Sequence, residues 1–316
     1  MRVLFLGSPE FAVPSLKALM KSPQYDLVAV ITQPDRKAGR GQKLTPPPVK
    51  TVATASEIPV FQFPRIRNNA EVQELLADLQ PELMVVVAFG QILPPDFFEF
   101  SAHGTLNVHA SLLPKYRGAA PVAHAILNGE RETGITIMRI DEGMDTGDVL
   151  SQKRIPIPDG LTTGELESCL AEEGAALLLD TLGGYVQGTV RPVSQNPLEV
   201  SYAPLISKKD GRINWEESAI AIHNRVRAMN PWPVASSLFR NQPVKIWRST
   251  VFESSGEIEV GAKEGTVVAL KKDRVVVQCG SSTYLGLATL QLPNRRRVSA
   301  GDFVNGNQLC VGEHFS

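Results

Sequence analysis

Two polar residues with complementary hydrogen-bonding chemistry stand two positions apart in an apolar segment. Asn107 and His109 alternate with Leu106 and Val108, and on a β-strand such alternate positions share one face. A carboxamide and an imidazole side by side can both donate hydrogen bonds to one developing oxyanion. The pair therefore predicts a site that stabilises negative charge during a reaction, with a histidine satisfied by the backbone as the plainer interpretation.

An acidic segment follows at residues 141–148, with four carboxylates and two glycines in eight positions. Such a composition disfavours core packing and predicts a surface loop after the preceding apolar run. A carboxylate of this loop could reach His109 and orient its imidazole. A solvated acidic turn is the alternative, because whether the loop and the strand meet depends on the fold.

The elements that must position these residues show an alternating pattern. Short apolar runs, separated in places by amphipathic stretches at 70–79 and 122–127, lie at 3–6, 27–32, 59–61, 83–88, 105–109 and 135–140. The run at 83–88 is apolar throughout, as in a central parallel strand that is buried on both faces. We therefore expect a Rossmann-like open α/β sheet, followed by a long helix over 163–185.

The residue composition and the hydrophobic pattern change after Gly188. Residues 189–206 carry three prolines and no clear period, which favours an extended linker. One helix at 218–229 then accompanies short β-like segments at 243–250, 265–270, 274–279, 283–290 and 297–298. We predict an α/β domain at 1–188, a linker at 189–206 and a small, OB-like C-terminal β-barrel at 207–316.

Composition and charge exclude several classes of protein. The 316 residues are 43% hydrophobic and 21% charged, which fits a globular chain rather than a disordered one. The longest apolar stretch, Leu83–Phe89, is too short for a membrane span. We recognise no secretory signal, and the three widely spaced cysteines form no CxxC pair, so we expect a cytoplasmic protein.

The charge is unevenly divided along the chain. Residues 1–206 hold 17 Lys+Arg against 23 Asp+Glu, a balance of −6, and residues 207–316 hold 15 against 10, a balance of +5, which together give −1. A basic second domain suggests a polyanionic partner, although small domains also differ by several charges without functional meaning. In the first domain, the turn at 7–11 has a single glycine and a proline, which disfavours a dinucleotide site.

The motifs together resemble the folate-dependent formyltransferases, and within them the branch that acts on methionyl-tRNA. The resemblance begins with Asn107-x-His109 and covers residues 111–118 and 143–148. Further matching segments lie at 32–36, 38–41, 118–121, 132–138 and 230–233. These segments span nearly the whole chain, which makes the resemblance specific.

The resemblance implies a catalytic trio of Asn107, His109 and Asp145. It implies 10-formyltetrahydrofolate as formyl donor, no metal, a monomer, and methionyl-initiator tRNA as acceptor. The folate-binding residues would be Ser111, Leu112, Leu113, Pro114, Phe89, Gly90, Ile92 and Met144, with the pterin ring against backbone near 88–93 and 141–144. The tRNA-binding residues would be Arg36, Lys37, Arg40, Lys43, Lys208, Lys209 and Arg248.

The segment from Gln33 to Lys50 acquires a function under this resemblance. Its five basic residues against Asp35 give a balance of +4, so a loop here could grip tRNA phosphates near the acceptor end. A long solvated connection is the alternative. Other basic residues of the second domain could follow the tRNA backbone in the same way.

Other functions remain open. A metal-dependent hydrolase could use His103, His109 and an acid from 141–148, although their spacing fits no familiar ligand motif. A non-catalytic RNA-binding module would explain the basic second domain and leave the polar trio without a role. Within the family, a glycinamide ribonucleotide or sugar-amine formyltransferase, or a formyltetrahydrofolate hydrolase, would lack the basic loop or the second domain, or would use water as acceptor.

Overall fold

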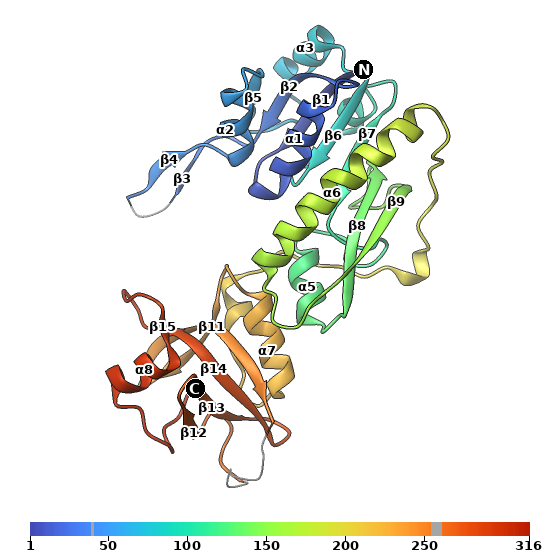
Figure 1. Cartoon of the computed structure of the whole chain (residues 1–316). Helices are drawn as coiled ribbons and strands as arrows, with labels where there is room; N and C mark the ends of the chain where they lie inside the picture. Colours follow the sequence, from blue (N-terminus) through green and yellow to red (C-terminus); the bar gives the residue numbers. More distant parts are fainter. Residues whose placement is uncertain (39–40, 254–260) are drawn as a thin grey trace. The chain divides into compact units, whose positions relative to one another are not determined.

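The computed structural model describes residues 1–38, 41–253 and 261–316 (Figure 1). The chain divides into two compact units. Unit 1 comprises Met1–Pro121, Glu132–Pro156 and Glu167–Ala203, and unit 2 comprises Val122–Arg131, Ile157–Leu166 and Pro204–Ser316. Among the described residues, no helix is long and apolar enough to cross a membrane.

Unit 1 is built on a seven-stranded sheet with the order β5-β2-β1-β6-β7-β8-β9. Its strands are β1 (Arg2–Gly7), β2 (Asp26–Thr32), β5 (Val60–Gln62), β6 (Leu83–Val87), β7 (Thr105–His109), β8 (Glu132–Arg139) and β9 (Val149–Pro156). The pairs from β5 to β7 are parallel, and β8 runs antiparallel to both of its neighbours. The predicted open α/β sheet is therefore confirmed.

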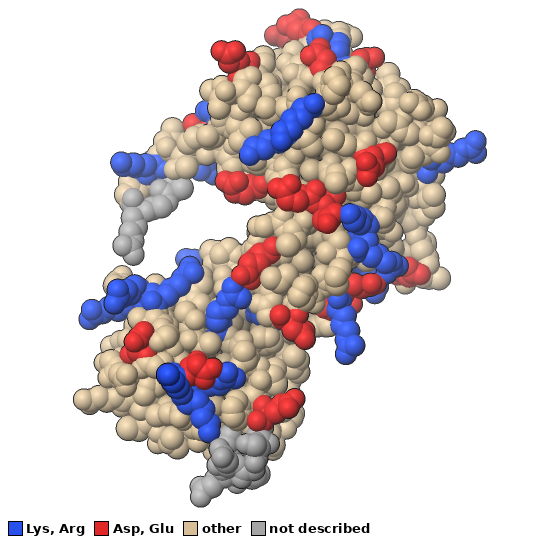
Figure 2. Space-filling model, viewed as in Figure 1, with Lys and Arg blue, Asp and Glu red and all other residues tan. Residues whose placement is uncertain are grey.

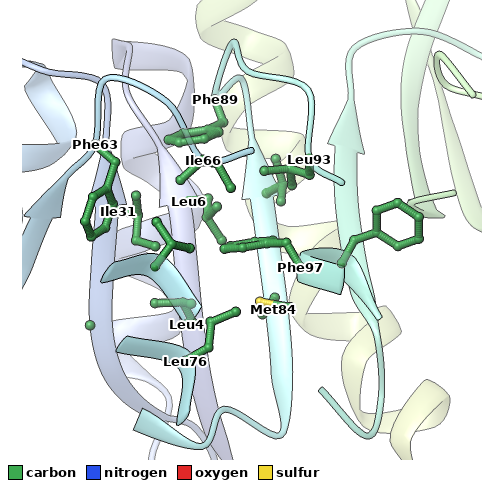
Figure 3. Close-up of a cluster of buried hydrophobic side chains, with 14 residues drawn as sticks. Leu4, Leu6, Ile31, Phe63, Ile66, Leu76, Met84, Phe89, Leu93 and Phe97 are labelled. Atoms are coloured by element: carbon green, nitrogen blue, oxygen red, sulfur yellow. The ribbon is translucent and has the colours of Figure 1, made fainter. Parts of the chain in front are cut away.

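Helices pack on this sheet, and one side of it carries a large apolar cluster (Figure 3). Leu4 and Leu6 of β1 face this cluster, together with Phe97 of α4 (Pro95–Phe98) and Leu76 of α3 (Ala70–Leu79). Val3 and Phe5, at the alternate positions of β1, are also fully buried. Both faces of the central strands are thus covered, which is the burial that the continuous apolar runs predict. The remaining helices of the first half are η1 (Glu10–Ala12), α1 (Val13–Lys21), α2 (Pro48–Ala55) and α5 (Pro121–Leu127).

The long helix α6 (Thr163–Val186) determines which face of β7 is available to a ligand. A Cβ atom at Gly174 of α6 would lie 3.0 Å from Cγ1 of Val108, so glycine permits the close approach of helix to strand. Val108 therefore lies under the helix, and its neighbours Asn107 and His109 point to the opposite face.

Three strands of unit 1 were not expected from the sequence. The segment 33–50, interpreted as a loop, contains a hairpin of β3 (Arg36–Ala38) and β4 (Lys43–Thr45), in which Lys37 pairs with Leu44. Strands of three residues are too short to show a period. β9 was missed because it is an edge strand whose central residues are polar and mostly exposed.

Unit 2 contains an antiparallel sheet with the order β10-β11-β14-β13-β12, and β15 pairs with β14. Its elements are η3 (Lys208–Gly211), α7 (Ala219–Ala228), β10 (Ala235–Phe239), β11 (Gln242–Phe252), β12 (Val267–Lys271), β13 (Arg274–Cys279), β14 (Thr283–Gln291), β15 (Val298–Ser299) and α8 (Ala300–Asn307). The expected C-terminal β-structure is confirmed, and its strands are antiparallel. β10 and α8 were not predicted.

Residues 312–316 close this sheet into a barrel. Ser316 and Leu238 of β10 exchange two backbone hydrogen bonds of 2.9 and 2.7 Å. On the other side, the amide of Val267 in β12 donates to the carbonyl of Glu313 at 2.7 Å. The two edge strands are therefore bridged by the same short segment, which removes both exposed edges.

Candidate active site

Asn107 and His109 lie at the carboxyl end of β7, between β6 and β8. Asn107 is paired with Val86 of β6 and with Met138 of β8, and His109 is paired with Thr136. The His109 side chain is buried, whereas Asn107 is half-buried. None of the hydrogen bonds within the described residues uses the Asn107 side-chain amide, so its donors are available to a ligand.

The two ring nitrogens of His109 have different partners. Nε2 lies 3.0 Å from the carbonyl oxygen of Tyr116, and because a carbonyl only accepts, Nε2 carries the proton of that hydrogen bond. Nδ1 faces Oδ1 of Asp145 at 3.6 Å, which is too long for a hydrogen bond but short enough for an ion pair with a protonated ring. The structure thus brings the acidic loop and the strand together.

Hydrogen bonds and close packing fix the position of Asp145. Its Oδ2 accepts from the amide of Gly118 at 2.8 Å, and its backbone has a φ of +53°. Within the loop, Asp141 accepts from the hydroxyl of Thr146 at 2.6 Å. A Cβ atom at Gly147 would lie 2.0 Å from the carbonyl of Arg139, so only glycine allows this path of the loop.

Gln195 is a positioning residue that the sequence did not reveal. Its Nε2 donates to the carbonyls of Asp145 at 2.8 Å and of Gly147 at 2.7 Å, while its Oε1 accepts from the guanidinium of Arg117. The surrounding segment also pairs with the backbone near Arg117, whose carbonyl accepts from the amide of Ala203 at 2.7 Å. A single glutamine in a proline-rich segment gave no signal of this role.

The segment Ser111–Pro114 is held rigidly beside His109. Ser111 donates from its hydroxyl to the carbonyl of Lys115 at 2.6 Å and accepts at its own carbonyl from Thr136. Gln152 donates to the carbonyl of Leu113 at 2.8 Å, and the peptide between Leu113 and Pro114 is cis. These contacts fix the backbone of the expected folate-binding segment, and Leu112 packs closely against β8 at Gly134.

The other expected folate-binding residues differ in what they expose. The side chain of Phe89 is buried in the apolar cluster (Figure 3), so only its backbone is available. Gly90 follows with a φ of +78°. Ile92 and Met144 are 83% and 60% exposed, which leaves two large apolar side chains free to contact a ring system.

The expected tRNA-binding residues fall into two sets. In unit 1, Arg36, Lys37 and Lys43 are exposed on the β3–β4 hairpin, over which basic side chains gather (Figure 2), and Arg40 lies outside the described residues. Lys50 is different, because its ammonium is bound to Asp35 and Gln62.

In unit 2, Lys208 and Lys209 are exposed on η3. Arg248 forms an ion pair with Glu165 and donates to the carbonyl of Gly160 at 3.0 Å. Its guanidinium is therefore partly engaged, although the side chain remains 46% exposed. Among the described residues of the whole chain, no group of three or more His, Cys, Asp or Glu side chains could hold a metal ion.

The fold and the site together define a class of protein. A carboxamide, an imidazole and a carboxylate at the end of a strand in an open α/β sheet are suited to the transfer of an acyl group through an oxyanion. The model of the family described as "Formyl transferase" matches residues 1–182, and that of "Formyl transferase, C-terminal domain" matches residues 205–308. The chain belongs to the formyl transferase family.

Individual relatives are similar over both units. The methionyl-tRNA formyltransferase of Pelotomaculum thermopropionicum is 47% identical, over 99% of this chain and 97% of the relative. That of Halalkalibacterium halodurans is 43% identical over the same shares. Among solved structures, the N-formyltransferase from Helicobacter canadensis, crystallised with folinic acid and dTDP-3-aminofucose, is similar with a TM-score of 0.66 and 24% identity, over 90% of this chain and 98% of that one.

Proposed function

We propose that this protein transfers the formyl group of 10-formyltetrahydrofolate to the α-amino group of methionyl-initiator tRNA, which supplies N-formylmethionyl-tRNA for translation initiation. The observation that carries the proposal is the meeting of Asn107, His109 and Asp145, in a chain similar over its length to methionyl-tRNA formyltransferases. The activity belongs in the cytoplasm and needs only a monomer.

The polar trio supplies the chemistry of the transfer. The uncharged amine attacks the formyl carbon, and Asn107 and His109 donate hydrogen bonds to the oxyanion that forms. The bond from this carbon to N10 of the folate then breaks, and N10 takes up a proton while the amine loses one. Asp145, which faces Nδ1 of His109, orients the imidazole and assists this proton movement.

The surroundings of the trio suit a folate. The backbone of residues 111–114 is fixed by hydrogen bonds, and the side chains of Ile92 and Met144 are exposed. We assign the folate to these residues and to the backbone of Phe89 and Gly90. Holding donor and amine in contact contributes much of the remaining acceleration.

We assign tRNA binding to the basic residues of both family domains. Arg36, Lys37, Arg40 and Lys43 would contact phosphates near the acceptor end, and Lys208, Lys209 and Arg248 would contact the backbone from residues 207–316. Under this assignment, residues 1–188 are the catalytic domain, 189–206 the linker and 207–316 the tRNA-binding domain. The basic hairpin favours tRNA over a small amine as acceptor.

A parallel transfer assay tests the proposal. Labelled 10-formyltetrahydrofolate is offered with initiator Met-tRNA, elongator Met-tRNA or glycinamide ribonucleotide, and the label in each acceptor is measured. Labelling of the initiator alone supports the proposal. Labelling of glycinamide ribonucleotide, or release of formate with no acceptor labelled, would overturn it in favour of another transferase or of a hydrolase.

A further inference from the structure

A network of half-buried polar groups holds the base of the β3–β4 hairpin. Lys50 donates to both carboxylate oxygens of Asp35 at 2.9 Å and to Oε1 of Gln62 at 2.8 Å, which uses all three of its donors. Gln62, at the end of β5, donates to Asp35 at 2.9 Å and to the carbonyl of Gln33 at 2.7 Å. The hydrogen bond from Lys50 keeps the pKa of Asp35 below its usual value. Both ends of the hairpin are therefore anchored to the sheet.

Gln33 is the residue of this network that contacts the turn after β1, the hairpin and the segment after β6. Its amide donates to the hydroxyl of Ser8 at 2.9 Å, in the turn after β1. Its side chain has two arms: Oε1 accepts from Arg36 of the hairpin at 3.1 Å, and Nε2 donates to the carbonyl of Phe89 at 3.1 Å. One carboxamide thus joins a basic residue of the hairpin to the segment that follows β6.

The segment after β6 is anchored through side chains from other parts of unit 1. Ala88 and Gly90 have φ values of +48° and +78°, so the backbone reverses sharply around Phe89. The ring of Phe89 is fixed in the core (Figure 3), and Gln33 holds its carbonyl. A separate anchor comes from Gln91, whose Nε2 donates to the carbonyl of Phe63 at 3.0 Å and whose Oε1 accepts from the amide of Ile66 at 2.9 Å.

We propose that Gln33 couples tRNA binding at the hairpin to folate binding at residues 88–93, an inference that rests on the proposed function. A phosphate bound by Arg36 restrains its guanidinium, which holds the half-buried carboxamide of Gln33 in the orientation that bonds Phe89. The folate then binds to backbone that is already ordered. By linkage, folate must tighten tRNA binding by the same factor.

The test measures the affinity for 5-formyltetrahydrofolate, a donor analogue, with and without saturating uncharged initiator tRNA, by isothermal titration calorimetry on the full chain. In the wild type, tRNA should tighten folate binding about five-fold or more. Gln33→Met removes both side-chain hydrogen bonds. Gln33→Glu keeps an acceptor for Arg36 but loses the donor to Phe89. Both variants should reduce the effect of tRNA to less than about two-fold.

Gln91→Met is the matched control, because it releases the same segment from its other anchor and leaves the hairpin untouched. Gln91→Met should weaken folate binding, but tRNA should still tighten that binding by the same factor as in the wild type. The coupling would be overturned if tRNA did not change the folate affinity of the wild type. It would also be overturned if tRNA tightened folate binding as much in both Gln33 variants as in the wild type. The transfer assay on the same preparation separates the two proposals, since a chain that formylates initiator Met-tRNA without coupling contradicts only this one.

Discussion

His109 has a hydrogen bond at one ring nitrogen and a carboxylate near the other, and this determines how it can act. With Nε2 donating to Tyr116, the proton available to an oxyanion is the one on Nδ1, which is present when the ring is charged and faces Asp145. Asp145 lies 3.6 Å from this nitrogen, so Nδ1 has a carboxylate neighbour but no short hydrogen bond to it.

His109→Ala removes this donor. We expect turnover to fall about 10²–10³-fold, as for the loss of one oxyanion donor, because the oxyanion exists only after the amine has attacked. The affinity for 5-formyltetrahydrofolate should change less than about two-fold, since the ring interacts with the transition state rather than with the bound donor. Single-turnover kinetics and calorimetry check the two values. Loss of folate binding would make His109 a binding residue instead.

Gln195→Glu tests whether the hydrogen bonds from Gln195 position the loop that carries Asp145. A glutamate keeps an acceptor for Arg117 but cannot donate to the carbonyls of Asp145 and Gly147. We expect kcat to fall about ten-fold, by misplacement of the carboxylate, with little change in unfolding temperature because the ion pair with Arg117 is available. Gln195→Met is the comparison, since it loses both contacts. Equal kcat in the wild type and Gln195→Glu would show that Asp145 needs no such support.

These residues differ in how far the sequence predicts them. Asn107 and His109 are found because the two-residue period of a strand places them on one face. The contact of His109 with Asp145 is not found by that route, because it depends on how the loop 141–148 folds back. Gln195 is still less predictable, since its role comes entirely from a segment that packs against Arg117.

At the scale of single elements, α7 carries a buried histidine that makes stability depend on pH. His223 is buried, lies 3.0 Å from the hydroxyl of Ser249 and has a pKa lowered to about 4, chiefly by burial and then by the charge of Arg227. Its usual value is 6.5, so between these two values the unfolded chain binds more protons than the folded one. The free energy of unfolding therefore decreases as the pH falls from 6.5 to 4.

His223→Gln should remove this dependence. The wild type should lose up to about 3 kcal/mol between pH 7 and pH 4 through His223, because the pKa falls from 6.5 in the unfolded chain to about 4 in the folded one, and the variant should not. Urea unfolding of both proteins at several pH values gives the difference between their free energies of unfolding. The contribution of carboxylates such as Glu165 cancels in this difference because both proteins contain them. Parallel curves for the two proteins would contradict the assignment.

The segment that closes the barrel buries one aromatic side chain. Phe315 is fully buried, with its ring 5.1 Å from that of Phe239 and 5.9 Å from that of Trp215. Phe315→Ala should lower the free energy of unfolding of unit 2 by about 3–5 kcal/mol, measured by urea unfolding with tryptophan fluorescence, since all three tryptophans of the chain lie in this unit. Val311→Ala, at a 59% exposed position, should stay within about 0.5 kcal/mol of the wild type. Similar losses in the two variants would argue against closure by this segment.

Elements are predictable to the extent that they are long and periodic. β6 and α6 are found because each has enough apolar residues for its burial to appear as a pattern. α8 (Ala300–Asn307) is missed because its two glycines and two asparagines oppose helix formation. Its helical state depends on the cap from Ser299 and the burial of Phe303.

At the scale of the whole molecule, the net charge of −1 conceals the separation of an acidic first part from a basic second part. The hairpin is an exception within the acidic part, since Arg36, Lys37 and Lys43 project from it. Polyanion binding by such a chain should depend on local clusters rather than on total charge. Each cation that contacts a phosphate then contributes separately to the salt dependence of binding.

Lys37→Ala and Lys43→Ala on the hairpin test whether local clusters, rather than total charge, govern polyanion binding. If each lysine neutralises one phosphate, each substitution should make the slope of log K against log salt shallower by about 1, and the double variant by about 2. Lys17→Ala in α1 removes the same charge from an exposed position away from the hairpin and should leave the slope unchanged. Filter binding of initiator tRNA between low and moderate salt gives the slopes. An equal change in all three single variants would mean that net charge, and not the hairpin, governs the affinity for tRNA.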